Sequence, residues 1–445
     1  MLLAIEALVI FASIHLSMYI FGESLSTETS NMGAVLFTII VMLCMTAMGL
    51  YQRNNGDKFE PTFVRMGASF VLAAVIVTVA VLLTTSVSVG LPTLYTAFAI
   101  AFWGVLAARF GYYSFVDKSS LKRRVLVLGA GEKAKSISQL RRYSDTRDFR
   151  IIGYVSVPSE KNTMNNNKVI HADTSLTDLT IQLSIDEIVV AIDDRRKTLP
   201  VDDILQCKMN GVKVFDLLTF FERETGRVRH DILQPSWMIF SDGFLQGTLR
   251  AVIKRSFDIA VSICMLVVVW PLMLLTALAI KIESHFHGPV LYYQQRTGQG
   301  GKLFNVMKFR SMHTDAEKDG IARWAKKNDS RITKVGSFIR KTRLDELPQI
   351  FNVLRGDMSF VGPRPERPEF VEKLHEKIPY FIERHRVKPG ITGWAQIRYP
   401  YGASEQDSSA KLEYDLYYVK NYSLFLDMMI LLQTAEVVLW GRGAR

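Results

Sequence analysis

Long apolar runs separated by short polar segments fill the first quarter of the chain. The runs cover approximately residues 2–21, 33–51, 66–89 and 91–113. Each is close to the roughly 20 residues that a helix needs to cross the hydrocarbon core of a bilayer. The pattern therefore predicts four transmembrane helices within residues 1–116. Glu6 and His15 lie inside the first run, where a polar side chain is functional, packed in the interior or positioned near the membrane interface.

Basic residues set the orientation expected for these helices. The loop at residues 22–32 has no Lys or Arg. Basic side chains mark the loop at 51–65 and the exit from the fourth run: Arg53, Lys58, Arg65, Lys118, Lys122, Arg123 and Arg124. Cytosolic loops carry the excess of Lys and Arg in membrane proteins. Both ends of the four-helix unit are therefore expected on the cytosolic side.

Short β-type runs alternate with polar helical segments over residues 117–249, which predicts a Rossmann-like α/β domain. Val125–Leu128 leads into the turn Gly129-Ala-Gly131-Glu-Lys-Ala134, and such a turn can bring a helix N-terminus up to a pyrophosphate. The second strand should end near Pro158, but the first acidic residue there, Glu160, comes late for a ribose ligand. The pattern favours a degenerate or regulatory nucleotide-binding fold over a working dehydrogenase.

A further apolar run, residues 259–280, has no charge and carries Pro271 near its middle. Its length would suffice for a membrane span. A proline inside a helix removes a hydrogen bond and kinks the helix, which suits a re-entrant segment that enters one leaflet and returns. The alternative is a kinked spanning helix. Lys254, Arg255 and Asp258 stand at the mouth of this hairpin, where they either anchor it or contact lipid head groups.

The last apolar segment, residues 424–440, is interrupted by Asp427, Gln433 and Glu436. Their spacing of three or six places them on one stripe of a helix. This segment is expected to lie in the membrane interface as an amphipathic helix.

Composition agrees with a chain that is partly membrane and partly soluble. Hydrophobic residues make up 49% of its 445 residues, and its net charge is +11. Three cysteines are too few for a disulfide scaffold. Residues 281–445 carry 27 Lys and Arg against 19 Asp and Glu, so the domain at 250–445 is expected to handle anions at a membrane surface. These basic residues lie in Gly- and Pro-punctuated motifs, not along a helix face, which argues against nucleic acid as a partner.

Five motifs follow one another in this last domain. They are GPVLYYQQRTG at 288–298, FNVMKFRSM at 304–312, TRLDELPQ at 342–349, NVLRGDMSFVGPRP at 352–365 and VKPGITGWAQ at 387–396. The series, from about Lys254 to about Asp427, resembles the bacterial sugar transferase family, the monotopic polyprenyl-phosphate hexose-1-phosphate transferases. The four helices, the Rossmann-like domain and the FERETG stretch at 221–226 are similar to long-form, exopolysaccharide-type members.

The resemblance implies a mostly α monotopic catalytic domain and a specific reaction. A sugar-1-phosphate would pass from a nucleoside diphosphate sugar, commonly a UDP-hexose, to undecaprenyl phosphate with release of UMP. This is the first membrane step of exopolysaccharide or O-antigen-type glycan assembly. The resemblance also implies a Mg²⁺ cofactor, a re-entrant 259–280 segment in contact with membrane lipids, and soluble domains on the cytosolic face of the bacterial inner membrane. It leaves room for a homodimer.

Adjacent carboxylates at Asp345 and Glu346 can take different roles, because neighbouring side chains on a helix diverge by about 100°. The resemblance implies that Asp345 is the nucleophile and forms a covalent phosphosugar intermediate, whereas Glu346 helps to bind magnesium. Arg364 lies between two prolines and has a planar guanidinium suited to phosphate oxygens. Further candidates for substrate or phosphate binding are Lys308, Arg310, Gln295, Arg296 and Gln396.

Two other functions are compatible with parts of the sequence. One is a membrane-tethered nucleotide-sensing scaffold with an inactive C-terminal domain, although the intact dyad argues against inactivity. The other is a nucleotide-sugar dehydratase or epimerase, which needs a Tyr-x-x-x-Lys pair after the Gly-rich turn. Tyr143 and Tyr154 are followed at that spacing by Arg147 and Pro158, so this function is disfavoured.

Overall fold

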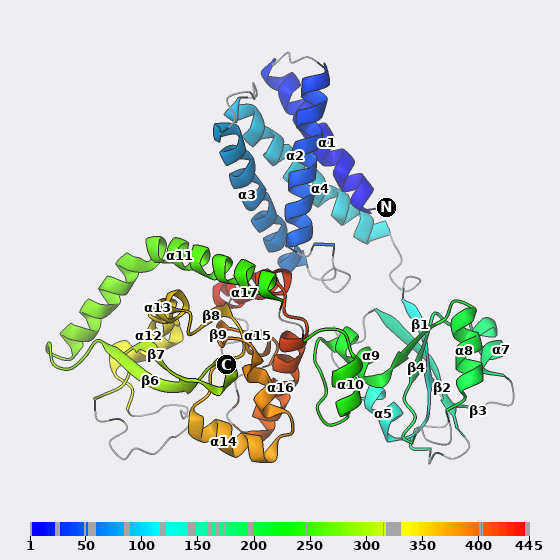
Figure 1. The fold of residues 1–445 in the computed structure, drawn as a ribbon. Coiled ribbons are helices and arrows are strands. Elements are labelled where there is room, and N and C mark those ends of the chain that lie inside the picture. The colour runs from blue at the N-terminus through cyan, green and yellow to red at the C-terminus, as the bar shows by residue number, and fades with distance from the viewer. Residues whose placement is uncertain are drawn as a thin grey trace. The chain divides into compact units, whose positions relative to one another are not determined.

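The protein is described by a computed structural model whose ribbon is shown in Figure 1. It describes residues 2–22, 27–48, 50–51, 59–83, 90–115, 122–140, 148–157, 160, 162–164, 169–171, 175–194, 199–244, 247–314, 316, 331–399, 402 and 404–440. Six residues used above lie outside these ranges: Arg53, Lys58, Lys118, Tyr143, Arg147 and Pro158. The chain divides into two compact units, Met1–Thr225 and Gly226–Arg445.

Four helices form the first part of the first unit: α1 (Leu2–Phe21), α2 (Thr27–Ala47), α3 (Phe59–Leu83) and α4 (Leu91–Phe115). They bury one apolar core, in which Ile10, Phe37, Met66 and Phe98 meet. Among the described residues, three helical segments are long and apolar enough to cross a membrane: Leu2–Phe21, Leu91–Tyr112 and Thr248–Glu283. The described apolar stretches of α2 and α3 are shorter, Asn31–Thr46 and Arg65–Thr78.

Glu6 is fully buried and takes part in an ion pair between α1 and α4. Its Oε1 lies 2.7 Å from the Nε of Arg109, and its Oε2 accepts a hydrogen bond of 2.5 Å from the hydroxyl of Tyr51. A charge inside an apolar bundle is tolerated when an opposite charge faces it. Of the three alternatives for Glu6, packing in the interior agrees with these contacts.

The rest of the first unit is a five-stranded, fully parallel sheet, which confirms the α/β expectation. Its strands are β1 (Arg123–Leu128), β2 (Phe149–Ser156), β3 (Val169–His171), β4 (Glu187–Val190) and β5 (Lys213–Asp216), in the order β3-β2-β1-β4-β5. Helices of this region are α5 (Glu132–Ser138), α7 (Leu176–Gln182), α8 (Val201–Met209) and α9 (Leu217–Thr225). The strands β1 and β4 read as nearly continuous apolar runs because both of their faces are covered.

The second unit combines many helices with two small sheets. Its elements are α10 (Pro235–Phe240), α11 (Thr248–Glu283), β6 (Leu291–Thr297), η2 (Gln299–Gly301), β7 (Leu303–Phe309), α12 (Lys334–Lys341), η3 (Leu344–Glu346), α13 (Gln349–Arg355), β8 (Ser359–Val361), α14 (Pro368–Lys377), η4 (Phe381–Arg386), β9 (Gly390–Thr392), α15 (Trp394–Arg398), α16 (Glu405–Lys420) and α17 (Leu424–Trp440). β6 pairs antiparallel with β7, and β8 pairs parallel with β9.

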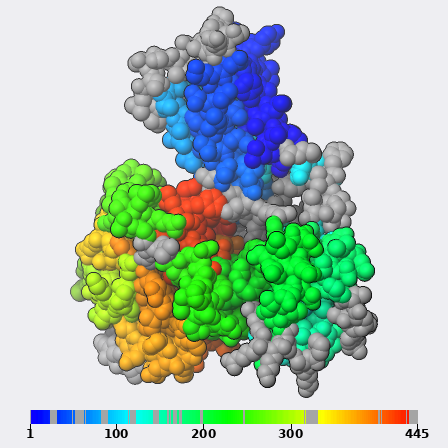
Figure 2. Space-filling model, turned by 45° about the vertical axis from the view of Figure 1, so that its right-hand side comes forward, coloured from blue at the N-terminus to red at the C-terminus, as the bar shows by residue number. Residues whose placement is uncertain are grey.

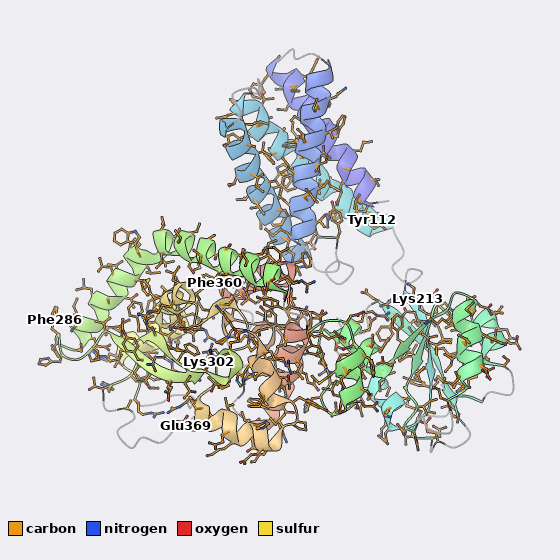
Figure 3. All side chains as sticks on the ribbon, viewed as in Figure 1. Tyr112, Lys213, Phe286, Lys302, Phe360 and Glu369 are labelled. Atoms are coloured by element: carbon orange, nitrogen blue, oxygen red, sulfur yellow. The ribbon has the colours of Figure 1, made fainter. Side chains whose placement is uncertain are left out.

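Helix α11 has a polar inner side and an apolar outer side. Its buried residues are Lys254, Asp258, Ser262, Thr276 and Ile280, whereas Val268, Trp270 and Leu275 are among its exposed ones. A straight helix of 36 residues would be about 54 Å long, well beyond a hydrocarbon core of about 30 Å. The helix contains Pro271 and bends along its course (Figure 1). We call the part of α11 before Pro271 its first arm and the part after Pro271 its second arm. Figure 3 shows Phe286 just beyond the end of the second arm.

Helix α17 lies beside the first arm of α11, as Figures 1 and 2 both show. Asp427 on α17 is fully buried, and its Oδ2 lies 2.7 Å from the Nζ of Lys254. Asp427 also accepts a hydrogen bond of 2.7 Å from the hydroxyl of Tyr418. Asp427 therefore faces a buried cation inside the protein, and the stripe expected to join it to Gln433 and Glu436 stays a prediction. The side chain of Glu436 lies outside the described residues.

Candidate active site

The dyad lies on a tight turn, not on a regular α-helix. Arg343 adopts a left-handed conformation (φ 60°) and starts the 3₁₀ turn η3, and Pro348 then precedes α13. Leu344 and Leu347, on either side of the dyad, pack against a cluster formed by Ile280, Phe309 and Ile339. The dyad is thereby held between the second arm of α11 and strand β7.

Two cations hold Glu346. Its Oε1 accepts hydrogen bonds from the Nη2 of Arg364 at 2.7 Å and from the Nζ of Lys308 at 3.0 Å. The side chain is only 9% exposed. Burial acts to raise the pKa of Glu346, but the charges of Arg364 and Lys308 outweigh it and hold this pKa well below its usual range. Glu346 is therefore a carboxylate at all ordinary pH values.

Asp345 has the opposite environment. It is equally buried, at 9% exposed, and its Oδ1 has no hydrogen-bond partner among the described residues. Burial and the neighbouring charge of Glu346 raise the pKa of Asp345. Two adjacent carboxyl groups thus differ sharply: one is paired, and the other presents an unpaired oxygen. Such a division is typical of sites where one carboxylate reacts and the other organises charge.

Strand β7 carries Lys308 toward Glu346, and Asn352 fixes that strand. The side chain of Asn352 accepts a hydrogen bond of 2.9 Å from the N–H of Met307 and donates one of 2.8 Å to the carbonyl of Asn305. The Asn352 side chain therefore forms the hydrogen bonds that a neighbouring strand would form. These bonds connect β7 to α13, the helix that follows the dyad. Sequence reasoning missed this role. The available signal was one polar residue, Asn352, within the otherwise apolar sequence Ile350–Leu354.

The other predicted substrate contacts have their own partners within the protein. Arg310 donates to the carbonyl of His287 at 3.4 Å, and Gln295 is exposed on β6 opposite Asn305. Gln396 donates to the carbonyl of Ile391 at 3.3 Å. Arg296 reaches the loop of Arg364, where its Nη1 donates to the carbonyl of Pro365 at 3.0 Å. The roles of these residues as substrate contacts remain predictions.

The charged residues in the first part of α11, expected at the mouth of a hairpin, make contacts within the protein. Besides its bond to Asp427, the Nζ of Lys254 lies 3.1 Å from the Oδ1 of Asp258. Asp258 also accepts hydrogen bonds from the hydroxyl of Ser359 at 3.1 Å and from the N–H of Phe360 at 3.3 Å; Figure 3 marks Phe360.

Arg255 contacts the end of helix α13. It donates to the carbonyls of Val353 and Leu354, each at 2.6 Å, where a cation stabilises the helix C-terminus. Of the two alternatives for the charged residues at the mouth, anchoring of α11 agrees with the contacts of Lys254, Arg255 and Asp258.

The dyad fits a magnesium ion in the way that such sites usually do. Mg²⁺ is commonly held by one or two carboxylates together with phosphate oxygens of the substrate, and not by a cage of protein ligands. The described residues contain no group of three or more His, Cys, Asp or Glu side chains able to hold a metal ion. Glu346 and the unpaired Oδ1 of Asp345 offer the hard oxygen atoms that this ion requires.

The glycine-rich turn of the first unit is filled by the chain itself. Asp193 accepts hydrogen bonds from the N–H groups of Glu132 (3.0 Å) and Lys133 (2.9 Å), and Glu160 accepts one from Ala130 (2.8 Å). A Cβ at Gly131 would lie only 2.1 Å from an Asp193 oxygen. The glycine is thus needed for an internal carboxylate, in the place where a pyrophosphate would bind in a dinucleotide fold.

Comparison with known proteins identifies the family to which this chain belongs. The family model described as "Bacterial sugar transferase" matches residues 249–441. A 371-residue alignment to an "uncharacterized sugar transferase" of Haemophilus influenzae is 30% identical and covers 77% of this chain and 76% of that protein. The chain belongs to the bacterial sugar transferase family.

Other relatives of this sugar transferase carry more specific names. The UDP-N-acetylgalactosamine-undecaprenyl-phosphate N-acetylgalactosaminephosphotransferase of Aeromonas hydrophila is 43% identical over 242 residues, which is 54% of this chain and 56% of that protein. The undecaprenyl-phosphate glucose phosphotransferase of Komagataeibacter xylinus is 44% identical over 196 residues, 43% of this chain and 36% of that protein. The chain thus spans about half, or less, of the length of these two relatives.

Proposed function

We propose that this protein transfers a sugar-1-phosphate from a nucleoside diphosphate sugar to undecaprenyl phosphate and releases the nucleoside monophosphate, UMP for a UDP-sugar. The observation that carries the proposal is the division of labour at the dyad. Asp345 presents an unpaired carboxylate oxygen, and Glu346 gathers two phosphate-binding cations beside it. The names of the relatives support undecaprenyl phosphate as the acceptor and a sugar nucleotide as the donor.

The transfer proceeds in two displacements at phosphorus. A carboxylate oxygen of Asp345 attacks the phosphorus that bears the sugar, the diphosphate P–O bond breaks, and UMP leaves with the bonding electrons. A phosphate oxygen of undecaprenyl phosphate then attacks the same phosphorus and frees Asp345. The covalent step divides one difficult transfer into two easier ones.

The cations of the site have a direct task in both displacements. Arg364 and Lys308 hold Glu346, the residue next to Asp345, in the free protein and would bind the phosphate oxygens of donor and acceptor. Glu346 would hold magnesium. When bound, Mg²⁺ neutralises negative charge on the diphosphate and on the departing UMP.

The membrane arrangement is part of the same proposal. The apolar outer side of α11 and the bend of this helix support a re-entrant segment that contacts membrane lipids from one face. The four N-terminal helices would span the inner membrane, and both soluble regions would face the cytosol, where nucleotide sugars are found. The reaction would then be the first membrane step of exopolysaccharide or O-antigen-type glycan assembly. A homodimer is compatible with this arrangement.

The test uses the purified full-length protein with Mg²⁺, undecaprenyl phosphate and a panel of radiolabelled UDP-sugars. We expect UMP release and a labelled lipid product with at least one donor. Asp345→Asn should abolish turnover and the labelled protein intermediate, whereas Glu346→Gln should mainly raise the Mg²⁺ concentration needed for half-maximal rate. Absence of lipid-linked product across the panel would favour the nucleotide-sensing scaffold. Full activity of both variants would refute the roles assigned to the dyad.

A further inference from the structure

The loop that carries Arg364 is held through its carbonyl groups. Pro363 and Pro365 have no N–H, so this loop can offer mainly hydrogen-bond acceptors to its surroundings. Three consecutive carbonyls are each bound from a different segment of the chain. The carbonyl of Pro363 accepts from the N–H of Gly390 at 3.0 Å, that of Arg364 from the Nη2 of Arg384 at 3.0 Å, and that of Pro365 from the Nη1 of Arg296 at 3.0 Å.

Arg384 is itself fixed by a buried carboxylate. It is 5% exposed, and its Nη2 and Nε lie 2.8 Å and 3.1 Å from the Oδ2 of Asp415 on helix α16. Asp415 is 2% exposed. One planar guanidinium therefore joins the middle of α16 to the backbone of Arg364, a geometry that the flexible ammonium group of lysine cannot reproduce.

Arg296 is oriented in a similar way from the opposite side of the loop. Its Nη2 and Nε donate to the Oε1 of Gln294 at 2.6 Å and 3.1 Å, so the third nitrogen is directed at the carbonyl of Pro365. Its side chain is 19% exposed. Arg296 thus contacts the Gln294 side chain, the Pro365 carbonyl and, at 3.7 Å, the carboxylate of Glu366. These contacts within the protein account for its burial.

We propose that Arg384, together with Asp415 and Arg296, forms a backbone clamp that sets the position of the Arg364 guanidinium beside the dyad. This inference rests on the proposed function and names positioning residues for the same site. The clamp acts at the main chain of Arg364, and the side chain of Arg364 transmits the position to Glu346 over 2.7 Å. A displacement of about 1 Å at a reacting site can cost on the order of 10²-fold in rate.

The first test is a double-mutant cycle on UMP release by the full-length protein in lipid nanodiscs. Arg384→Met should lower kcat/KM on the order of 10²-fold, and Arg384→Lys should recover only part of that loss. If Arg384 acts through Arg364, adding Arg384→Met to Arg364→Ala should cause little further loss. Losses that multiply in the double variant would overturn the clamp, because they would show that Arg384 acts independently of Arg364.

A matched control comes from the same helix. The Nη1 of Arg227 lies 3.2 Å from the Oε2 of Glu413, which is two residues before Asp415 on α16. Among the described residues, this is the ion pair that the Arg227 side chain forms. Arg227→Met removes an arginine–carboxylate contact to α16 of comparable kind and should leave kcat/KM within about threefold of the wild-type value. A loss as large as that of Arg384→Met would show that any weakening of α16 suffices, which contradicts a specific clamp.

The second readout does not depend on activity. Hydrogen–deuterium exchange in the peptide that covers residues 362–367 should become faster in Arg384→Met and in Arg296→Met, and should be unchanged in Arg227→Met. Unchanged exchange in all three variants would overturn the clamp even if the enzyme is active. Conversely, the wild-type protein could release no UMP while the three variants show the expected exchange pattern. That result would refute the proposed function and leave the clamp in place.

Discussion

At the scale of single residues, identical chemical groups have opposite roles according to their surroundings. Asp345 and Glu346 are neighbours, but two cations pair with Glu346, whereas the Oδ1 of Asp345 has no described partner. In the first unit, the carboxylates of Asp193 and Glu160 have yet another role. They accept hydrogen bonds from the backbone N–H groups of a turn that resembles a phosphate-binding turn. Carboxylates can therefore imitate an anionic ligand as well as react with one.

The internal carboxylate of Asp193 leads to a prediction about nucleotide binding. Because its oxygens already bind the N–H groups of Glu132 and Lys133, millimolar NAD⁺ or ADP should not raise the melting temperature of the wild-type protein. Asp193→Ala should destabilise the first unit by roughly 1–2 kcal/mol, as for the loss of a helix cap. Asp202→Ala, an exposed acidic residue in the first turn of α8, should cost less. Differential scanning calorimetry checks both, and a nucleotide-dependent rise in the wild type would contradict the prediction.

Part of the site could be predicted from residue order, and part could not. The motif series indicated Asp345, Glu346, Lys308 and Arg364, and the structure brings Lys308 and Arg364 to one oxygen of Glu346. Asn352 and the pair Arg384–Asp415 were missed because each acts on the backbone of a segment distant in sequence, and such contacts leave no periodic pattern. The parallel sheet was predicted because alternating short apolar runs depend on local periodicity alone.

At the scale of elements, α11 and η4 both bury charged or polar side chains. Helix α11 places Lys254, Asp258 and Ser262 inward at intervals of four and leaves apolar residues outside. The short 3₁₀ segment η4 buries Arg384 and His385 next to one another. Both elements owe their position to polar contacts in addition to apolar packing, so both should respond to changes of single residues.

Pro271 is expected to determine the path of α11. Pro271→Ala restores a helix hydrogen bond and should favour a straight, spanning helix, which would place the following residues on the opposite side of the membrane in part of the molecules. The measurement is labelling of an exposed site, Glu372→Cys, by an impermeant thiol reagent in inverted and right-side-out vesicles, in a Cys264→Ser background. Leu272→Ala is the matched control and should keep the wild-type sidedness. Unaltered sidedness in Pro271→Ala would count against this role.

His385 predicts a pH dependence of stability. Burial, assisted by the charge of Arg384, lowers the pKa of His385 from 6.5 to about 3. The unfolded chain therefore binds a proton that the folded protein does not, and folding stability should be lost as the pH falls from 6.5 toward 3. In His385→Gln, the free energy of unfolding should fall with decreasing pH less steeply than in the wild type, by up to about 1.4 kcal/mol per pH unit. Urea unfolding at pH 7 and pH 5 measures the slope, and the exposed His375→Gln serves as the control.

At the scale of the whole molecule, the second unit begins before the region that the family model matches. The model starts at residue 249, but the segment 226–244 already packs on the second unit. The Nε1 of Trp394 donates to the carbonyl of Gly226 at 2.7 Å, and the ring of Trp237 lies 4.0 Å from the Nζ of Lys420. Residues 226–244 thus belong to the fold of the second unit in this sugar transferase.

This extension leads to a prediction about shortened proteins. A protein that begins at Gly226 should unfold at a clearly higher temperature than one that begins at Thr248. The shorter protein leaves the buried Trp394 N–H without its acceptor, at a cost of about 1–3 kcal/mol, and loses the Arg227–Glu413 pair as well. Thermal unfolding in detergent compares the two, and equal midpoints would show that the segment adds nothing to stability.

The filled glycine turn has a consequence for regulation. With Asp193 and Glu160 in the place of a phosphate, a nucleotide that signals the redox or energy state of the cell would have to displace these carboxylates to bind at this turn. Under the proposed function, the rate of transfer would then follow the supply of sugar nucleotide and lipid carrier, without a nucleotide effector at this turn.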